Sequence, residues 1–126
     1  MAIKKYKLDI GEISKDFSVS IIKFSTKLKS QRVEYSIIKQ LIRSGTSIGA
    51  NIREAKSSSS LKEYIRFLEI ALRSANETDY WLEIIDEIYK NKEDSNVLIM
   101  ELTQIRKILG SIIVKLKQKN VIVNSQ

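Results

Sequence analysis

Apolar residues recur every three or four positions through most of this chain, and no proline interrupts the pattern. That period belongs to one face of an α-helix, whereas a half-buried strand alternates apolar and polar residues. A β-rich fold would also need many turn residues, and the sequence has only four glycines among 126 residues. The pattern therefore predicts an all-α protein of long helices joined by short connections.

Polar breaks divide the chain into four expected helices, which cover about residues 13–29, 34–56, 61–90 and 96–119. The clearest break is the serine run 57–60, after which Ser60 and Glu63 have the spacing of a helix capping box. Short connections favour antiparallel neighbours. We therefore expect one domain, 1–126, folded as an antiparallel up-down-up-down four-helix bundle with a loose tail at 120–126.

The second expected helix contains small residues where helix interiors usually avoid them. The stretch LIRSGTSIGANIREA keeps the apolar period but includes Gly45, Ser47 and Gly49. Each interior glycine costs about 1 kcal/mol relative to alanine, so we interpret the three residues as a close-packing motif for a facing helix, with Tyr80 or Trp81 filling the space. A local kink is the alternative. A phosphate-binding loop would need a following Gly-Lys-Ser/Thr and an upstream strand, and neither is present.

The third expected helix is apolar on two sides and therefore needs two partners. One stripe suits the bundle core. The other can be covered by a neighbouring helix or by another subunit. We predict that this second stripe forms an oligomer interface, made by Phe67, Ile70, Trp81, Ile84 and Ile88.

Polar residues also fall at helical spacing beside these apolar stripes. Asn51 and Glu54 lie about one turn apart on the second helix, and Glu77 falls on an apolar stripe of the third. Burying a carboxylate alone is costly. We interpret Asn51, Glu54 and Glu77 as a polar clasp that fixes helix register, in which Asn51 and Glu77 satisfy each other or backbone groups. Ligand or metal binding and simple solvent exposure are the alternatives.

The net charge of +7 is unevenly distributed. Residues 1–56 hold 12 Lys/Arg and 5 Asp/Glu, residues 57–94 hold 5 and 9, and residues 95–126 hold 5 and 1. The basic blocks favour contact with RNA or DNA phosphates. The candidate contacts are Lys23, Lys27, Lys29, Lys39, Arg43 and Arg53. The alternative is an AT-rich coding sequence that raises lysine content without function. Aromatic residues are not interleaved with these charges, so neither base stacking nor sequence-specific reading is expected.

Histidine and cysteine are both absent, which excludes Ser-His and Cys-His nucleophile pairs and the Glu-x-x-His di-iron pattern. We expect no enzyme activity, no cofactor and no metal site. The N-terminus lacks the apolar stretch of a signal peptide, and no apolar run is long enough to span a membrane. A cytoplasmic protein without a membrane partner is therefore expected.

Two blocks, RSGTSIGANIREA and EYIRFLEIALRSANETDYWLEII, resemble the four-helix-bundle proteins encoded by intervening sequences in bacterial 23S rRNA genes. The resemblance covers roughly residues 40–85. Many relatives have Glu-Gly where this chain has Glu54-Ala55, so its second helix is expected to extend further. The resemblance implies a homo-oligomeric ring, most readily a pentamer. The family is also similar to the accessory variability proteins of diversity-generating retroelements, which form basic barrels that engage nucleic acid and a reverse transcriptase.

The leading hypothesis is therefore a non-enzymatic, ring-forming helical bundle that contacts nucleic acid weakly and without sequence preference. The competing hypothesis is an oligomeric scaffold that binds another protein and has no affinity for nucleic acid. Binding that weakens steeply with salt would favour the first, because phosphate contacts release counterions.

Overall fold

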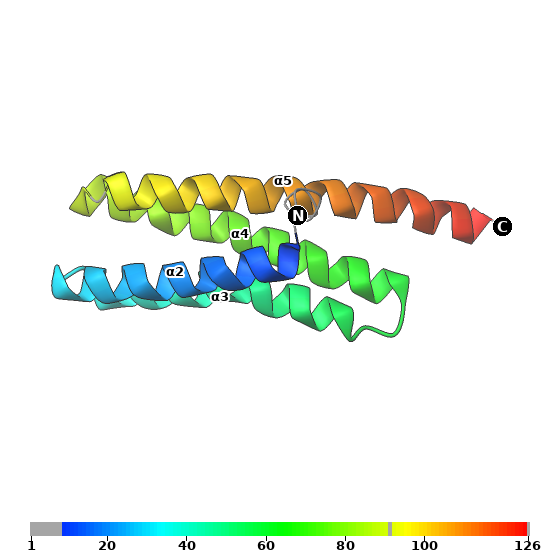
Figure 1. The fold of residues 1–126 in the computed structure, drawn as a ribbon, viewed down its shortest axis with the longest axis horizontal. Helices are drawn as coiled ribbons and strands as arrows, with labels where there is room; N and C mark the ends of the chain where they lie inside the picture. Colours follow the sequence, from blue (N-terminus) through cyan, green and yellow to red (C-terminus); the bar gives the residue numbers. More distant parts are fainter. Residues whose placement is uncertain (1–8, 91, 126) are drawn as a thin grey trace, which may run out of the picture.

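The computed structural model describes residues 9–90 and 92–125, and within them the chain forms four helices and no strand. The helices are α2 (Ile10–Ser30), α3 (Tyr35–Lys56), α4 (Leu61–Tyr89) and α5 (Lys92–Ser125). Figure 1 shows the chain reversing direction from each helix to the next. Each helix packs on the one that follows it, and α5 also packs on α2, which closes the bundle. The predicted all-α four-helix bundle is confirmed.

Local side chains set where the helices begin and end. The Asp9 carboxylate caps α2 by accepting hydrogen bonds from the Gly11 and Glu12 amides at 2.9 and 3.4 Å. The Ser60 hydroxyl caps α4 by accepting one from the Glu63 amide at 3.1 Å. At the other end of α4, Lys90 adopts a left-handed conformation with φ of 56°, which stops the helix.

The core lies along the axis between the four helices, on the faces that the apolar spacing predicts. Its largest fully buried side chains come from every helix: Phe17, Ile21, Leu28, Ile38, Leu41, Ile48, Leu68, Leu82, Ile85, Leu102, Ile105 and Leu109. Burying such a side chain contributes about 1.5–3 kcal/mol each. The amphipathic pattern is therefore the main source of stability in this fold.

The last helix is longer than the sequence pattern indicates. It begins at Lys92 and continues to Ser125, so the loose tail expected at 120–126 is helical as far as Ser125. Residues 111–125 contain neither proline nor glycine, and nothing in their local sequence therefore stops a helix. Residue 126 lies outside the described part of the chain.

The two glycines of α3 face α2. A Cβ added to Gly45 would lie 2.9 Å from Cγ1 of the fully buried Ile21. One added to Gly49 would lie 3.3 Å from the Ser14 hydroxyl. The space at Gly45 is thus filled by an isoleucine of α2. The expected filler, Tyr80 or Trp81 of α4, does not occupy it, because Gly45 faces α2.

Candidate functional site

The seam between α3 and α4 is a ladder of hydroxyl groups. The Thr78 hydroxyl donates to the Ser44 hydroxyl at 3.0 Å, and both side chains are fully buried. Nearer the surface, the Ser74 hydroxyl donates to the Ser47 hydroxyl at 3.1 Å. Ser47 therefore belongs to the α3–α4 seam, whereas Gly45 and Gly49 belong to the α2–α3 seam. These rungs satisfy polar groups that would otherwise be costly to bury.

Glu77 is held at the outer edge of this seam. Its carboxylate pairs with the Arg43 guanidinium across the two helices, and it accepts a hydrogen bond from the Trp81 indole at 3.0 Å. Arg43 also donates to the Gln40 side chain at 2.9 and 3.0 Å. The polar partner that Glu77 required on its apolar stripe is therefore Arg43, which the sequence had suggested only as a nucleic-acid contact.

The other two residues of the predicted clasp do not meet Glu77. The Asn51 amide donates to the Ser47 carbonyl and hydroxyl within its own helix, at 2.8 and 3.0 Å. Glu54 is exposed and lines a separate cleft near the start of α2. Of the two alternatives for the clasp, Asn51 follows the second and bonds to a backbone group instead of to Glu77, because an amide one turn from a hydroxyl finds its acceptors locally.

An apolar edge runs along α4 beside this polar seam. Tyr80 and Ile88 are 56% and 57% exposed, and Ile70 and Ile84 are half-buried. The remaining two residues of the predicted interface, Phe67 and Trp81, are also half-buried but pack against the core of their own chain. The stripe is thus divided into an inner part that packs against the core and an outer part that the monomer leaves to solvent.

The six predicted nucleic-acid contacts do not form one surface. On α2, Lys23 and Lys27 line a hollow shared with α5, and Lys27 pairs with Asp94. Lys29 is exposed in the last turn of α2.

On α3, the three basic side chains point to different neighbours. Lys39 lies over the Tyr35 ring, 5.7 Å from its centre, and Arg43 is paired with Glu77. Arg53 lines the cleft near the start of α2. The sequence predicts that these residues lie on one helix but not which side chains surround it, so it could not predict that the three point in different directions.

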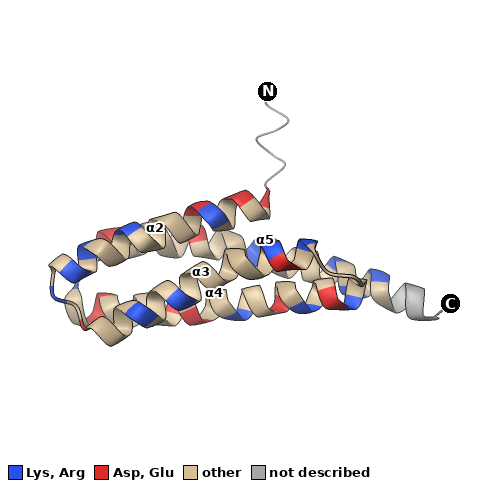
Figure 2. Ribbon diagram, turned by 90° about the horizontal axis from the view of Figure 1, so that it is seen from below, with Lys and Arg blue, Asp and Glu red and all other residues tan. Residues whose placement is uncertain are grey.

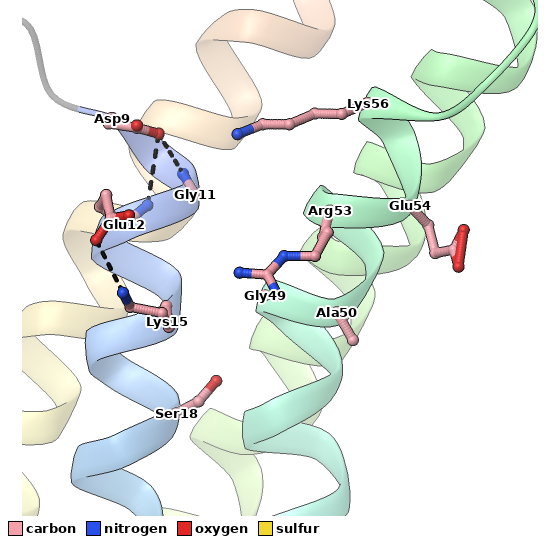
Figure 3. Close-up of a pocket in the computed structure, with 10 residues that line it drawn as sticks. All are labelled: Asp9, Gly11, Glu12, Lys15, Ser18, Gly49, Ala50, Arg53, Glu54 and Lys56. Carbon is pink, nitrogen blue, oxygen red and sulfur yellow. Dashed lines mark hydrogen bonds and ion pairs between the residues drawn. The ribbon is translucent and has the colours of Figure 1, made fainter.

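That cleft, between the start of α2 and the end of α3, has a volume of about 410 Å³ (Figure 3). The Arg53 guanidinium points into it, and the Glu54 carboxylate points away. Lys15 is already paired with Glu12 at 3.2 Å. The lining contains as many acidic as basic side chains, so the cleft has no strong preference for an anion.

The carboxyl group of Glu101 on α5 has a shifted pKa. Burial of Glu101 on α5 raises its pKa above the ordinary value of 4.5, and the nearby negative charge of Asp16 on α2 raises it further. Within residues 9–90 and 92–125, no group of three or more potential ligand side chains could hold a metal ion. None of the helices described here is both long and apolar enough to cross a membrane.

Comparison with known proteins gives the family. The model of the 23S rRNA-intervening sequence proteins matches residues 6–111. The chain belongs to this family. Among solved structures it is similar to a Bacteroides thetaiotaomicron protein with unknown function from the S23 ribosomal protein family, at 42% identity and a TM-score of 0.80. That similarity covers 83% of this chain and 98% of the other. No curated protein matches.

Proposed function

We propose that this family member is a non-enzymatic subunit of a homo-oligomeric ring, pentameric as the family resemblance implies, that contacts nucleic acid weakly and without sequence preference. The observation that carries the proposal is the outer edge of α4. Ile88 and Tyr80 expose more than half of their surface there, and the half-buried Ile84 lies between them in the sequence, with the half-buried Ile70 further toward the start of α4. An exposed apolar strip bordered by polar groups is typical of a protein interface.

Assembly would bury this strip without disturbing the polar seam beside it. The hydroxyl ladder and the Arg43–Glu77 pair are already satisfied inside one chain. A neighbouring subunit therefore has to supply apolar contact and little else. Repetition of one subunit around a ring would also multiply any weak phosphate contact, because linked sites bind with an increased effective concentration.

The apolar edge can be tested by the mass of the native protein in solution. Ile84→Asp together with Ile88→Asp should convert the oligomer to monomer, because each charge would be desolvated at the interface. Val97→Asp with Met100→Asp is the matched control, since these two side chains of α5 are 58% and 72% exposed and lie outside the proposed contact. Retention of the full mass by the Ile84/Ile88 variant would contradict the proposed interface.

Nucleic-acid contact is supported by the net charge of +7 and is tested by titration with unrelated RNA and DNA at several salt concentrations. We expect affinity to fall linearly with salt on logarithmic axes, and to be similar for all sequences.

The alternative, a protein-binding scaffold, is favoured by one observation. Two of the six candidate basic residues, Lys27 and Arg43, are consumed by internal ion pairs. An oligomer that binds neither RNA nor DNA even at low salt would establish this alternative in place of the first.

A further inference from the structure

Gly110 is the one glycine in the described helices that no neighbour explains. Added Cβ atoms at Gly11, Gly45 and Gly49 would meet other atoms at 3.1, 2.9 and 3.3 Å, whereas one at Gly110 would meet nothing within 4 Å. A glycine inside a helix costs helix stability relative to alanine. Packing among the described residues does not offset this cost. One use of such a glycine is to let a bound molecule approach the backbone closely.

Basic and polar side chains surround Gly110 on the same face of α5. Lys107, Ser111 and Lys115 follow at intervals of four residues, which places them along one side of the helix. All three are exposed. Gly110 and Val114 lie beside them, and Val114 is 56% exposed. The two lysines are about 12 Å apart along the axis, from eight residues at 1.5 Å each, so they can contact separate phosphates.

This part of α5 also contains no acidic residue, unlike α4, on which it packs. From residue 102 to the C-terminus there are five Lys/Arg and no Asp or Glu. Figure 2 shows acidic and basic positions interspersed along α4, which packs against α5, and only basic ones toward the C-terminal end of α5.

Two of those five basic side chains form ion pairs with acidic residues of α4. Arg106 lies 3.3 Å from Asp79, and Lys117 lies 2.7 Å from Glu69. Lys107 and Lys115 form no ion pair with any residue between 9 and 120 whose side chain is described. Their charges remain available to a partner outside the chain.

We propose that the phosphate backbone of a nucleic acid lies along this face of α5, with Lys107 and Lys115 contacting phosphates and Gly110 permitting the close approach. The inference rests on the nucleic-acid contact proposed above, and it places that contact on α5 instead of on α2 and α3. The Ser111 hydroxyl lies between the two lysines in the helical register and can donate to a phosphate oxygen. No base is read, because the face offers no aromatic side chain for stacking.

The test compares two double variants that each remove two positive charges. Lys107→Gln with Lys115→Gln should weaken binding of a single-stranded RNA several-fold and reduce the salt slope by about 1.4, at about 0.7 per lost contact. Lys56→Gln with Lys92→Gln is the matched control, because both lysines are exposed and line hollows to which residues 102–120 do not contribute. The control should keep the wild-type slope.

Equal losses in the two double variants would mean that only net charge matters, and would overturn the proposed location while leaving nucleic-acid binding intact. An unchanged slope in the Lys107/Lys115 variant would overturn it as well. If the wild-type protein binds no RNA or DNA at low salt, both this inference and the proposed nucleic-acid contact fail together.

Gly110→Leu tests the close approach without threatening the fold. Leucine favours a helix more than glycine does, and the site has room for it, so the melting temperature should not fall. The added side chain should nevertheless weaken RNA binding several-fold. A variant that is fully folded and binds RNA as tightly as the wild type would show that nothing approaches the backbone at Gly110.

Discussion

Helix α3 packs against its two neighbours by different means. Toward α2 it presents Gly45 and Gly49, and the absence of side chains lets Ile21 and Ser14 come close. Toward α4 it presents Ser44 and Ser47, whose hydroxyls bond to Thr78 and Ser74. The first seam depends on shape and tolerates no added volume. The second depends on matching donors and acceptors, so it specifies register.

The largest effect should come from filling the α2–α3 seam. Gly45→Leu should destabilise the fold by about 3 kcal/mol, because its Cβ alone would collide with a fully buried isoleucine. The same substitution at Gly110, where space is open, should stabilise the protein by about 0.8 kcal/mol. Urea unfolding measures both. Equal effects at the two glycines would show that helix propensity, and not packing, determines the change in stability.

The α3–α4 seam should respond to lost hydrogen bonding instead of added volume. Thr78→Val keeps the shape but removes the hydroxyl that hydrogen-bonds to the buried Ser44 hydroxyl and to the Ser74 carbonyl, at a cost of about 1–2 kcal/mol. Adding Ser44→Ala should cost less than the sum of the two single changes, since the pair acts as a unit. Strict additivity in the double-mutant cycle would mean that the rung is not an energetic pair.

The ion pair at the outer edge of the same seam should contribute less to the stability of the fold. Arg43 and Glu77 are 57% and 37% exposed, and exposed ion pairs contribute about 0–1 kcal/mol. Glu77→Gln should therefore destabilise the fold by about 0.5 kcal/mol or less, while the Trp81 indole keeps an acceptor. Tryptophan fluorescence reports the change locally because Trp81 is the single tryptophan. A loss as large as that of Thr78→Val would make Glu77 a core element of the seam.

The smallest effect concerns the α2–α5 seam, which brings the like charges of Asp16 and Glu101 near each other. Because the folded-state pKa of Glu101 is raised, its contribution to stability is present below the ordinary value of 4.5 and is lost as pH rises through the raised pKa. Glu101→Gln should thus slightly raise the urea midpoint at pH 7 and make no difference below pH 4.5. A lower midpoint at pH 7 would contradict the sign of the shift.

These contrasts also show what the sequence could predict. Apolar spacing and the serine break were enough for the four helices and the core, because both are local properties of a helix. The small residues of α3 predicted close packing but not its direction. Gly45 faces Ile21 and Ser47 faces Ser74, and only the assembled bundle distinguishes these two sides.

The contacts of the candidate site were harder to predict from the sequence, for the same reason. The partner of Glu77 is Arg43, 34 positions away in the sequence, and that pairing depends on the relative rotation of two helices. The basic residues of α2 and α3 likewise proved to point toward different neighbours. Exposure of Ile88 agrees with the need for a second partner that the two stripes of α4 indicated, yet the partner itself stays a proposal.

The claim that copies of this chain cover the outer edge of α4 is tested most directly by sedimentation equilibrium of the wild-type protein over a range of micromolar concentrations. The account predicts a single species whose mass is a multiple, fivefold for the expected ring, of the 14.5 kDa chain. A mass of 14.5 kDa at every concentration would contradict it.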